Sequence, residues 1–122
     1  VKGQPISGVK EKYYVSAETL RQEMIAAIGD AAHELATRAL REGNTRNARL
    51  AAAIGRMVDP INEVFWRDAL RAEHMAGDSA GVERLVTQLE HALTQIDPDY
   101  AEPEPETEEL IEQLRRRQAV AS

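Results

Sequence analysis

REGNT (41–45) and MAGDS (75–79) are two turns of matching chemistry, and they decide the fold that the sequence predicts. Their glycines lie 34 residues apart. Glycine suits the end of a helix because it adopts a positive φ at little cost. The residue that follows, Asn44 or Asp78, suits the start of the next helix because its side chain can accept a backbone N–H. Each turn therefore predicts a helix, a short turn and a second helix.

The first helix is predicted from the spacing of its apolar residues. Ser16 is a candidate N-cap, and apolar residues then recur every three or four positions. They include Leu20, Met24, Ile28 and Leu35, which we expect on one buried face. The helix should end at the first of the two turns.

Four further helices are predicted downstream. Asp59-Pro60 separates the second from the third, and Pro60 suits the first residue of a helix. No segment alternates with a period of two, so no sheet is expected. The five predicted helices span about 16–42, 45–58, 60–76, 79–96 and 106–117.

The spacing of Gly43 and Gly77 also suggests how the helices pack. A helix–turn–helix period of 34 residues is that of tetratricopeptide (TPR) arrays. We therefore predict an all-α fold in which antiparallel helix pairs stack as TPR-like repeats, with the helix at 106–117 as a C-terminal cap. The alternative is two unrelated helix pairs whose short turns coincide.

Two segments fall outside the predicted helices. Residues 1–15 contain glycines and a proline and are expected to form a loop leading into the domain at 16–117. DPDYAEPEP (97–105) is predicted to be an acidic linker within that domain, because three prolines disfavour a helix. The sequence begins with Val1 rather than Met, so we expect it to be a piece of a larger protein.

The composition limits the classes of function. The formal net charge of -6 disfavours direct nucleic-acid binding. No apolar run approaches the ~20 residues of a membrane span, so no membrane contact is expected. The 43% of hydrophobic residues can form one core, which must be aliphatic because aromatics make up 4%. There is no cysteine for a disulfide or a thiolate metal site.

Several longer stretches resemble a known family. QEMIAAIGDAAHELA (22–36), VDPINEVFWRDALRAEHMAGD (58–78) and PEPETEELIEQL (103–114) are similar to the bacterial transcriptional activator domain, and GQPISG (3–8) resembles the stretch that often opens it. Ile6 departs from that pattern, since the family often has an aromatic there. The resemblance implies a TPR-like regulatory domain, found in winged-helix regulators and in membrane proteins of high-GC bacteria that carry LysM regions.

Candidate catalytic and metal-binding patterns are weak. A di-iron bundle needs paired Glu-x-x-His motifs, and only the segment from Asp30 to His33 comes near one. Serines and threonines in the turns have capping roles. We therefore expect no enzyme activity, no catalytic residue, no metal and no cofactor. The run from Arg115 to Arg117 is interpreted as a cationic last helical turn.

The candidate partner-binding residues lie on the first helix of each predicted pair. In a TPR-like fold these helices line the concave groove, where a cluster of cations could receive an acidic partner segment. Phe65 and Trp66 point about 100° apart on a helix, so one ring could be an exposed anchor while the other fills the core. The alternative is that both rings are buried. The candidates are Arg38, Arg41, Trp66, Arg67 and Arg71.

These observations predict a non-catalytic, regulatory protein-interaction domain of a transcription-regulator-like protein. The expected partners are upstream domains of its own chain or a second copy, in the cytoplasm or on the cytoplasmic side of a membrane-anchored protein. One alternative is a structural helical scaffold of a LysM-linked cell-envelope protein. The other is a helical metal-dependent enzyme.

Overall fold

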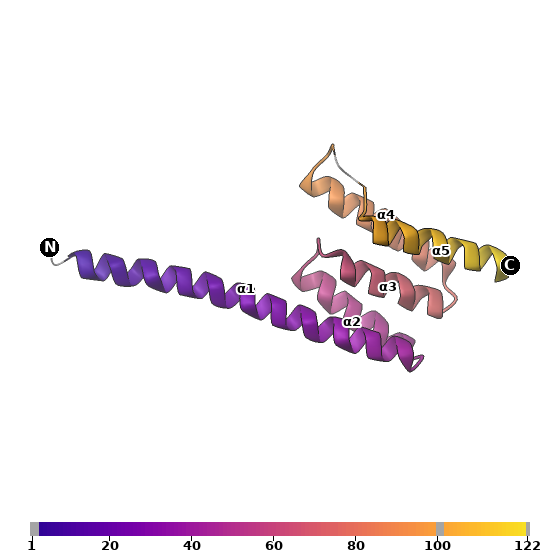
Figure 1. Ribbon diagram of the computed structural model, residues 1–122, viewed down its shortest axis with the longest axis horizontal. Coiled ribbons are helices and arrows are strands. Elements are labelled where there is room, and N and C mark those ends of the chain that lie inside the picture. The colour runs from indigo at the N-terminus through magenta and orange to yellow at the C-terminus, as the bar shows by residue number, and fades with distance from the viewer. Residues whose placement is uncertain (1–2, 100–101, 122) are drawn as a thin grey trace.

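The computed structural model describes residues 3–99 and 102–121, with side chains for 16–99 and 102–120. It contains five helices and no strand within those residues (Figure 1), so the all-α prediction is confirmed. The helices are α1 (Gly3–Arg41), α2 (Thr45–Val58), α3 (Glu63–Met75), α4 (Ser79–Ile96) and α5 (Pro105–Ala121).

Helix α1 is longer than predicted. It begins at Gly3, so most of the segment 1–15 expected as a loop is helical, and Ser16 lies inside the helix instead of capping it. Pro5 falls in the first turn, where a missing N–H costs no intrahelical bond. Beyond Gly8, the stretch VKEKYYVSAETL (9–20) contains no further glycine or proline to interrupt the helix.

The two glycine turns have the same geometry, as predicted. Gly43 and Gly77 adopt φ of 70° and 74°. The N–H of the residue after each glycine bonds the carbonyl five residues back, and the N–H of the glycine bonds the carbonyl three back. These are the paired bonds of the Schellman motif. Asn44 and Asp78 then cap α2 and α4 by accepting the backbone N–H three residues on.

The boundaries of α3 and α5 differ from those predicted. Asn62 caps α3 by accepting the N–H of Val64, and Pro60 lies in the preceding turn instead of starting the helix. The turn satisfies the backbone locally, because the N–H of Asn62 bonds the carbonyl of Asp59. Pro105 starts α5, which shortens the linker to 97–104, and α5 continues to Ala121. The cationic run 115–117 is therefore not its last turn.

The helices pack in the order of the chain. Helix α1 contacts α2 and α3, and α3 also contacts α4 and α5, so α1, α3 and α5 are neighbours along one side. Figure 1 shows the first half of α1 extending beyond the other helices. The main core is built mostly from aliphatic side chains of α3, α4 and α5, among them Leu70, Val82, Leu89, Leu110, Ile111 and Leu114.

Small residues bring α1, α2 and α3 close together. Ala32, Ala36 and Ala39 form the buried face of α1, and Ala48, Ala51, Ala52 and Gly55 form that of α2. The ring of Phe65 fills the space between Gly29 and Gly55, since a Cβ built on either glycine would meet it. This close packing places the polar face of α3 between α1 and α5.

Candidate partner-binding surfaces

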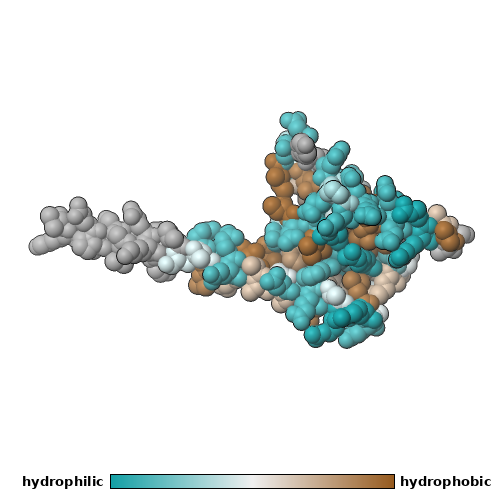
Figure 2. All heavy atoms as spheres, in the orientation of Figure 1, coloured by the Kyte–Doolittle hydropathy of each residue, from teal (hydrophilic) through white to brown (hydrophobic). Residues whose placement is uncertain are grey.

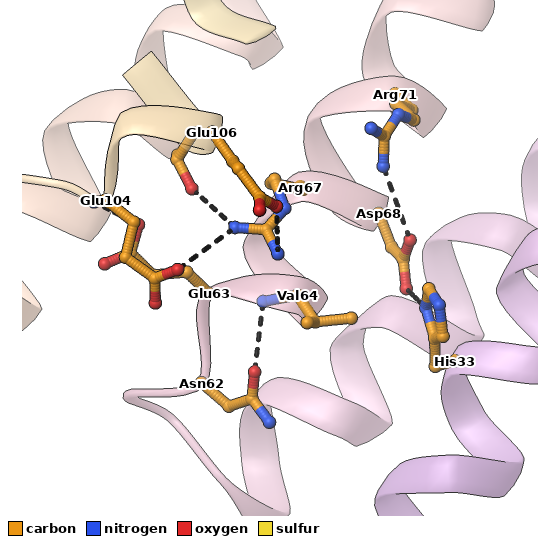
Figure 3. Close-up of polar contacts among 10 residues, drawn as sticks. His33, Asn62, Glu63, Val64, Arg67, Asp68, Arg71, Glu104 and Glu106 are labelled. Carbon is orange, nitrogen blue, oxygen red and sulfur yellow. Dashed lines mark hydrogen bonds and ion pairs between the residues drawn. The ribbon is translucent and has the colours of Figure 1, made fainter. Parts of the chain in front are cut away.

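Arg67 connects α3 to the start of α5. Its guanidinium donates to the Thr107 hydroxyl at 2.9 Å and forms ion pairs with Glu104 at 3.7 Å and Glu106 at 3.5 Å (Figure 3). The Arg67 side chain is 11% exposed, and Thr107 is fully buried. Arg67 therefore holds its own chain together, which leaves it little surface for a partner.

Glu63 makes a second connection between the same elements. It is buried at the first residue of α3, and its carboxylate accepts the backbone N–H of Glu104 at 2.9 Å. Glu104, at the end of the linker, thus pairs with the Arg67 cation through its carboxylate and donates its backbone N–H to Glu63. Together, Glu63 and Arg67 connect the start of α5 to α3.

His33 and Asp68 connect α1 to α3 on the other side. The Nδ1 atom of His33 lies 2.6 Å from a carboxylate oxygen of Asp68, and Arg71 lies 3.9 Å from the second oxygen. Asp68 is buried, and burial raises the pKa of its carboxyl, while the hydrogen bond and charge of His33 act in the opposite direction. A paired carboxylate orients an imidazole, but covalent catalysis also needs a nucleophile. Among the described side chains, no hydroxyl is hydrogen-bonded to His33.

A groove of about 280 Å³ lies between α3 and α5. Arg71 and Arg116 line it, but so do Glu106 and Glu109, so it carries both signs of charge. Its lining is therefore mixed, with three arginines and two glutamates, rather than purely cationic as the spacing of the arginines predicts. The other lining residues are Arg67, Leu110 and Gln113.

The structure brings Arg67 and Arg71 to one groove but separates them from the other predicted partner-binding residues. Arg38 lines a different groove, between α1 and α2, while Arg41 is exposed at the end of α1. Trp66 as an exposed anchor is wrong, because both Trp66 and Phe65 are buried. The Trp66 indole N–H donates to the carbonyl of Pro60 at 2.8 Å, and that bond satisfies its polar atom inside the core.

The groove between α1 and α2 is the more apolar of the two. It measures about 320 Å³, and its apolar lining consists of Leu35, Ala39, Leu50, Ala51 and Ile54. Arg38, Glu42 and Asn47 complete it. Helical spacing extends this surface along both helices, through large side chains that are 39% to 80% exposed. We call this surface the outer face, and it comprises Leu20, Met24, Ile28, Leu35, Leu50, Ile54 and Met57.

The outer face corrects the prediction that the stripe through Leu20, Met24, Ile28 and Leu35 is buried. Helix α1 has a second stripe, made of Gly29 and the buried alanines, and that stripe faces α2 and α3. Figure 2 shows hydrophobic residues among hydrophilic ones along the described part of α1, where it leaves the other helices. The presence of two stripes on one helix was the sequence signal for an exposed apolar surface.

Comparison with known proteins gives no relative from which to assign a function. No family model matches the chain, and no curated protein or solved structure matches it significantly. Within residues 3–99 and 102–121, no three acidic or histidine side chains are grouped so that they could hold a metal ion. None of the helices in that part of the chain combines the length and the apolar character needed to cross a membrane.

Proposed function

We propose that this chain is a non-catalytic protein-interaction domain that binds its partner through the outer face. The observation that carries the proposal is the exposure of seven large apolar side chains on α1 and α2. Single exposed apolar residues are ordinary, but a continuous apolar surface of this extent marks an interaction site on a folded protein. The charged groups at its border, Arg38 and Glu42, give it the polar rim that is typical of interfaces.

The proposal includes a TPR-like stack of two helix pairs, α1–α2 and α3–α4, with α5 as the terminal cap. Three features support it. The turns repeat at 34 residues with the same hydrogen bonds, the first helix of each pair contacts the next first helix, and α5 packs its apolar face onto the last pair. Stacks of this kind expose the face of a terminal pair unless another element covers it.

The regulatory part of the proposal rests on the resemblance to the bacterial transcriptional activator domain. In that reading, docking on the outer face positions a separate domain of a transcription-regulator-like protein in the cytoplasm. The chain itself then supplies binding and no chemistry. The polar contacts of Glu63, Arg67 and Asp68 stabilise the stack and do not contact the partner.

The test replaces Leu35 and Ile54 together by Glu in the full-length protein. Both side chains are exposed in the groove, so helicity and the unfolding midpoint should change little. Complexes that contain the protein, measured in cell extracts by cross-linking and native electrophoresis, should be lost, and its transcriptional output should change.

The matched control replaces two apolar residues that are exposed elsewhere, Ile96 and Val120, by Glu. This control should leave complexes and output unchanged. If the Leu35/Ile54 variant keeps its helicity, its complexes and its output, the outer face is not the functional surface.

A further inference from the structure

We infer that the occupant of the outer face is a second copy of this chain, in a twofold dimer in which the two α1 helices run antiparallel. In this dimer the extended part of each α1 lies in the groove between α1 and α2 of the other copy. The inference rests on the proposed function and names its partner. It is carried by the area of the outer face and the order of its apolar residues.

The area of the outer face is sufficient for a stable dimer. If a fully exposed Leu, Ile or Met presents roughly 180 Å², the exposed fractions of the seven side chains amount to roughly 700 Å² per chain. Stable interfaces bury about 600–1,000 Å² per partner, so the outer face reaches the lower part of that range, and the largest apolar patch on an ordinary monomer is about 300–600 Å². The outer face therefore exceeds what a monomer usually exposes.

The shape of α1 explains why a second copy fits. The first half of α1 extends beyond the other helices (Figure 1), and Leu20 and Met24, near the middle of α1, are both more than half exposed. The groove that could receive such side chains lies further along the same helix, at Leu35. A twofold axis near residues 27 and 28 brings the extended part of each copy onto the groove of the other. An interface of this kind is self-complementary and closed.

The apolar residues of α1 match in this antiparallel register. When residues whose numbers add to 55 lie opposite each other, Leu20 faces Leu35 of the other copy and Met24 faces Ala31. Ile28 then faces Ala27 near the axis. Met24 and Ile28 thus each meet an alanine, and Leu20 meets the edge of the groove at Leu35. Large side chains on one helix therefore fit into spaces on the other, as helix packing requires.

The first experiment measures the mass of the purified chain in solution by sedimentation over a range of concentrations. The wild-type chain should form a dimer. Leu20→Glu should make it monomeric without loss of helicity, because this side chain is 57% exposed within its own chain. Ile96→Glu is the matched control, since Ile96 is equally exposed on another surface and should leave the dimer unchanged.

The second experiment tests the register with an introduced ion pair. Leu20 faces Leu35 of the other copy, so adding Leu35→Arg to Leu20→Glu places opposite charges across both of these contacts and should restore the dimer. A partner other than a second copy could not produce this rescue.

A chain that stays monomeric at concentrations up to about 1 mM overturns the inference. So does a dimer that Leu20→Glu leaves intact. Either result would leave the proposed function standing, because its own test detects complexes of any composition.

Discussion

Replacing Gly55 by Ala should destabilise this protein, although Ala normally favours a helix. A Cβ at Gly55 would lie 2.2, 2.5 and 2.7 Å from three ring atoms of Phe65. Favourable carbon contacts lie at about 3.5–4.0 Å, so the ring must move by roughly 1 Å or more. It cannot move freely, because Gly29 of α1 borders the same ring and Phe65 is buried.

The magnitude follows from two opposing effects. Overpacking a closed core costs about 1–3 kcal/mol, and the gain in helix propensity from Gly to Ala offsets about 1 kcal/mol of it. Because the ring is confined from both sides, we expect a cost near the upper limit. The free energy of unfolding should fall by about 1–2 kcal/mol, measured from urea denaturation followed by circular dichroism at 222 nm.

Gly29→Ala is the matched control within the same contact. Its Cβ would meet only the tip of the Phe65 ring, at 3.0 Å, so strain and propensity should nearly cancel. Adding Phe65→Leu to Gly55→Ala should recover part of the loss, which gives a non-additive double-mutant cycle. If Gly55→Ala is as stable as the wild type, the ring does not fill the space between α1 and α2, and the packing argument fails.

Four other outcomes are expected. Gly43→Val or Gly77→Val should each lower the free energy of unfolding by about 1–2 kcal/mol, because φ is positive at both positions. No atom lies within 4 Å of the new Cβ, so the backbone conformation alone causes the loss. Asn at the same position should cost less. Thr107→Val should lower it by about 1–2 kcal/mol in urea denaturation, since Arg67 loses one buried acceptor but keeps its ion pairs. Burial raises the pKa of Asp68, so the folded state holds that proton more tightly than the unfolded state. As pH rises from the ordinary pKa of the carboxyl through its raised value, the free energy of unfolding of the wild type should therefore fall relative to that of Asp68→Asn, which cannot ionise. If the free energies of unfolding of the two proteins change in parallel with pH, this expectation is wrong. Finally, the acidic chain should not retard duplex DNA in a gel at physiological salt, and a salt-sensitive complex would overturn that expectation.

The helices and their turns could be predicted because the signals are local. The hydrogen bonds at Gly43 and Gly77, and the caps at Asn44 and Asp78, all join residues within five positions of each other. Such contacts depend on residue chemistry and short-range geometry alone. The prediction was wrong at Pro60, where two helix-start signals compete within four residues and Asn62 makes the cap.

The contacts that position the candidate surfaces could not be predicted, because they join distant parts of the chain. Arg67 and Thr107 are 40 residues apart, and His33 and Asp68 are 35 apart. In the sequence, Arg67 and Arg71 are only two cations spaced one turn apart. Whether such a cation meets a partner or its own chain depends on which helices are neighbours, and helical periodicity does not specify this.

Helix α1 shows most clearly what the sequence determines and what only tertiary packing decides. Its sequence determines a helix with an apolar stripe of large residues, Leu20 to Leu35, beside a second stripe of glycine and alanine. Tertiary packing alone decided which stripe is buried. Small side chains let α2 and α3 approach α1 closely enough to enclose the ring of Phe65. The larger residues consequently remain outside, where they form the outer face.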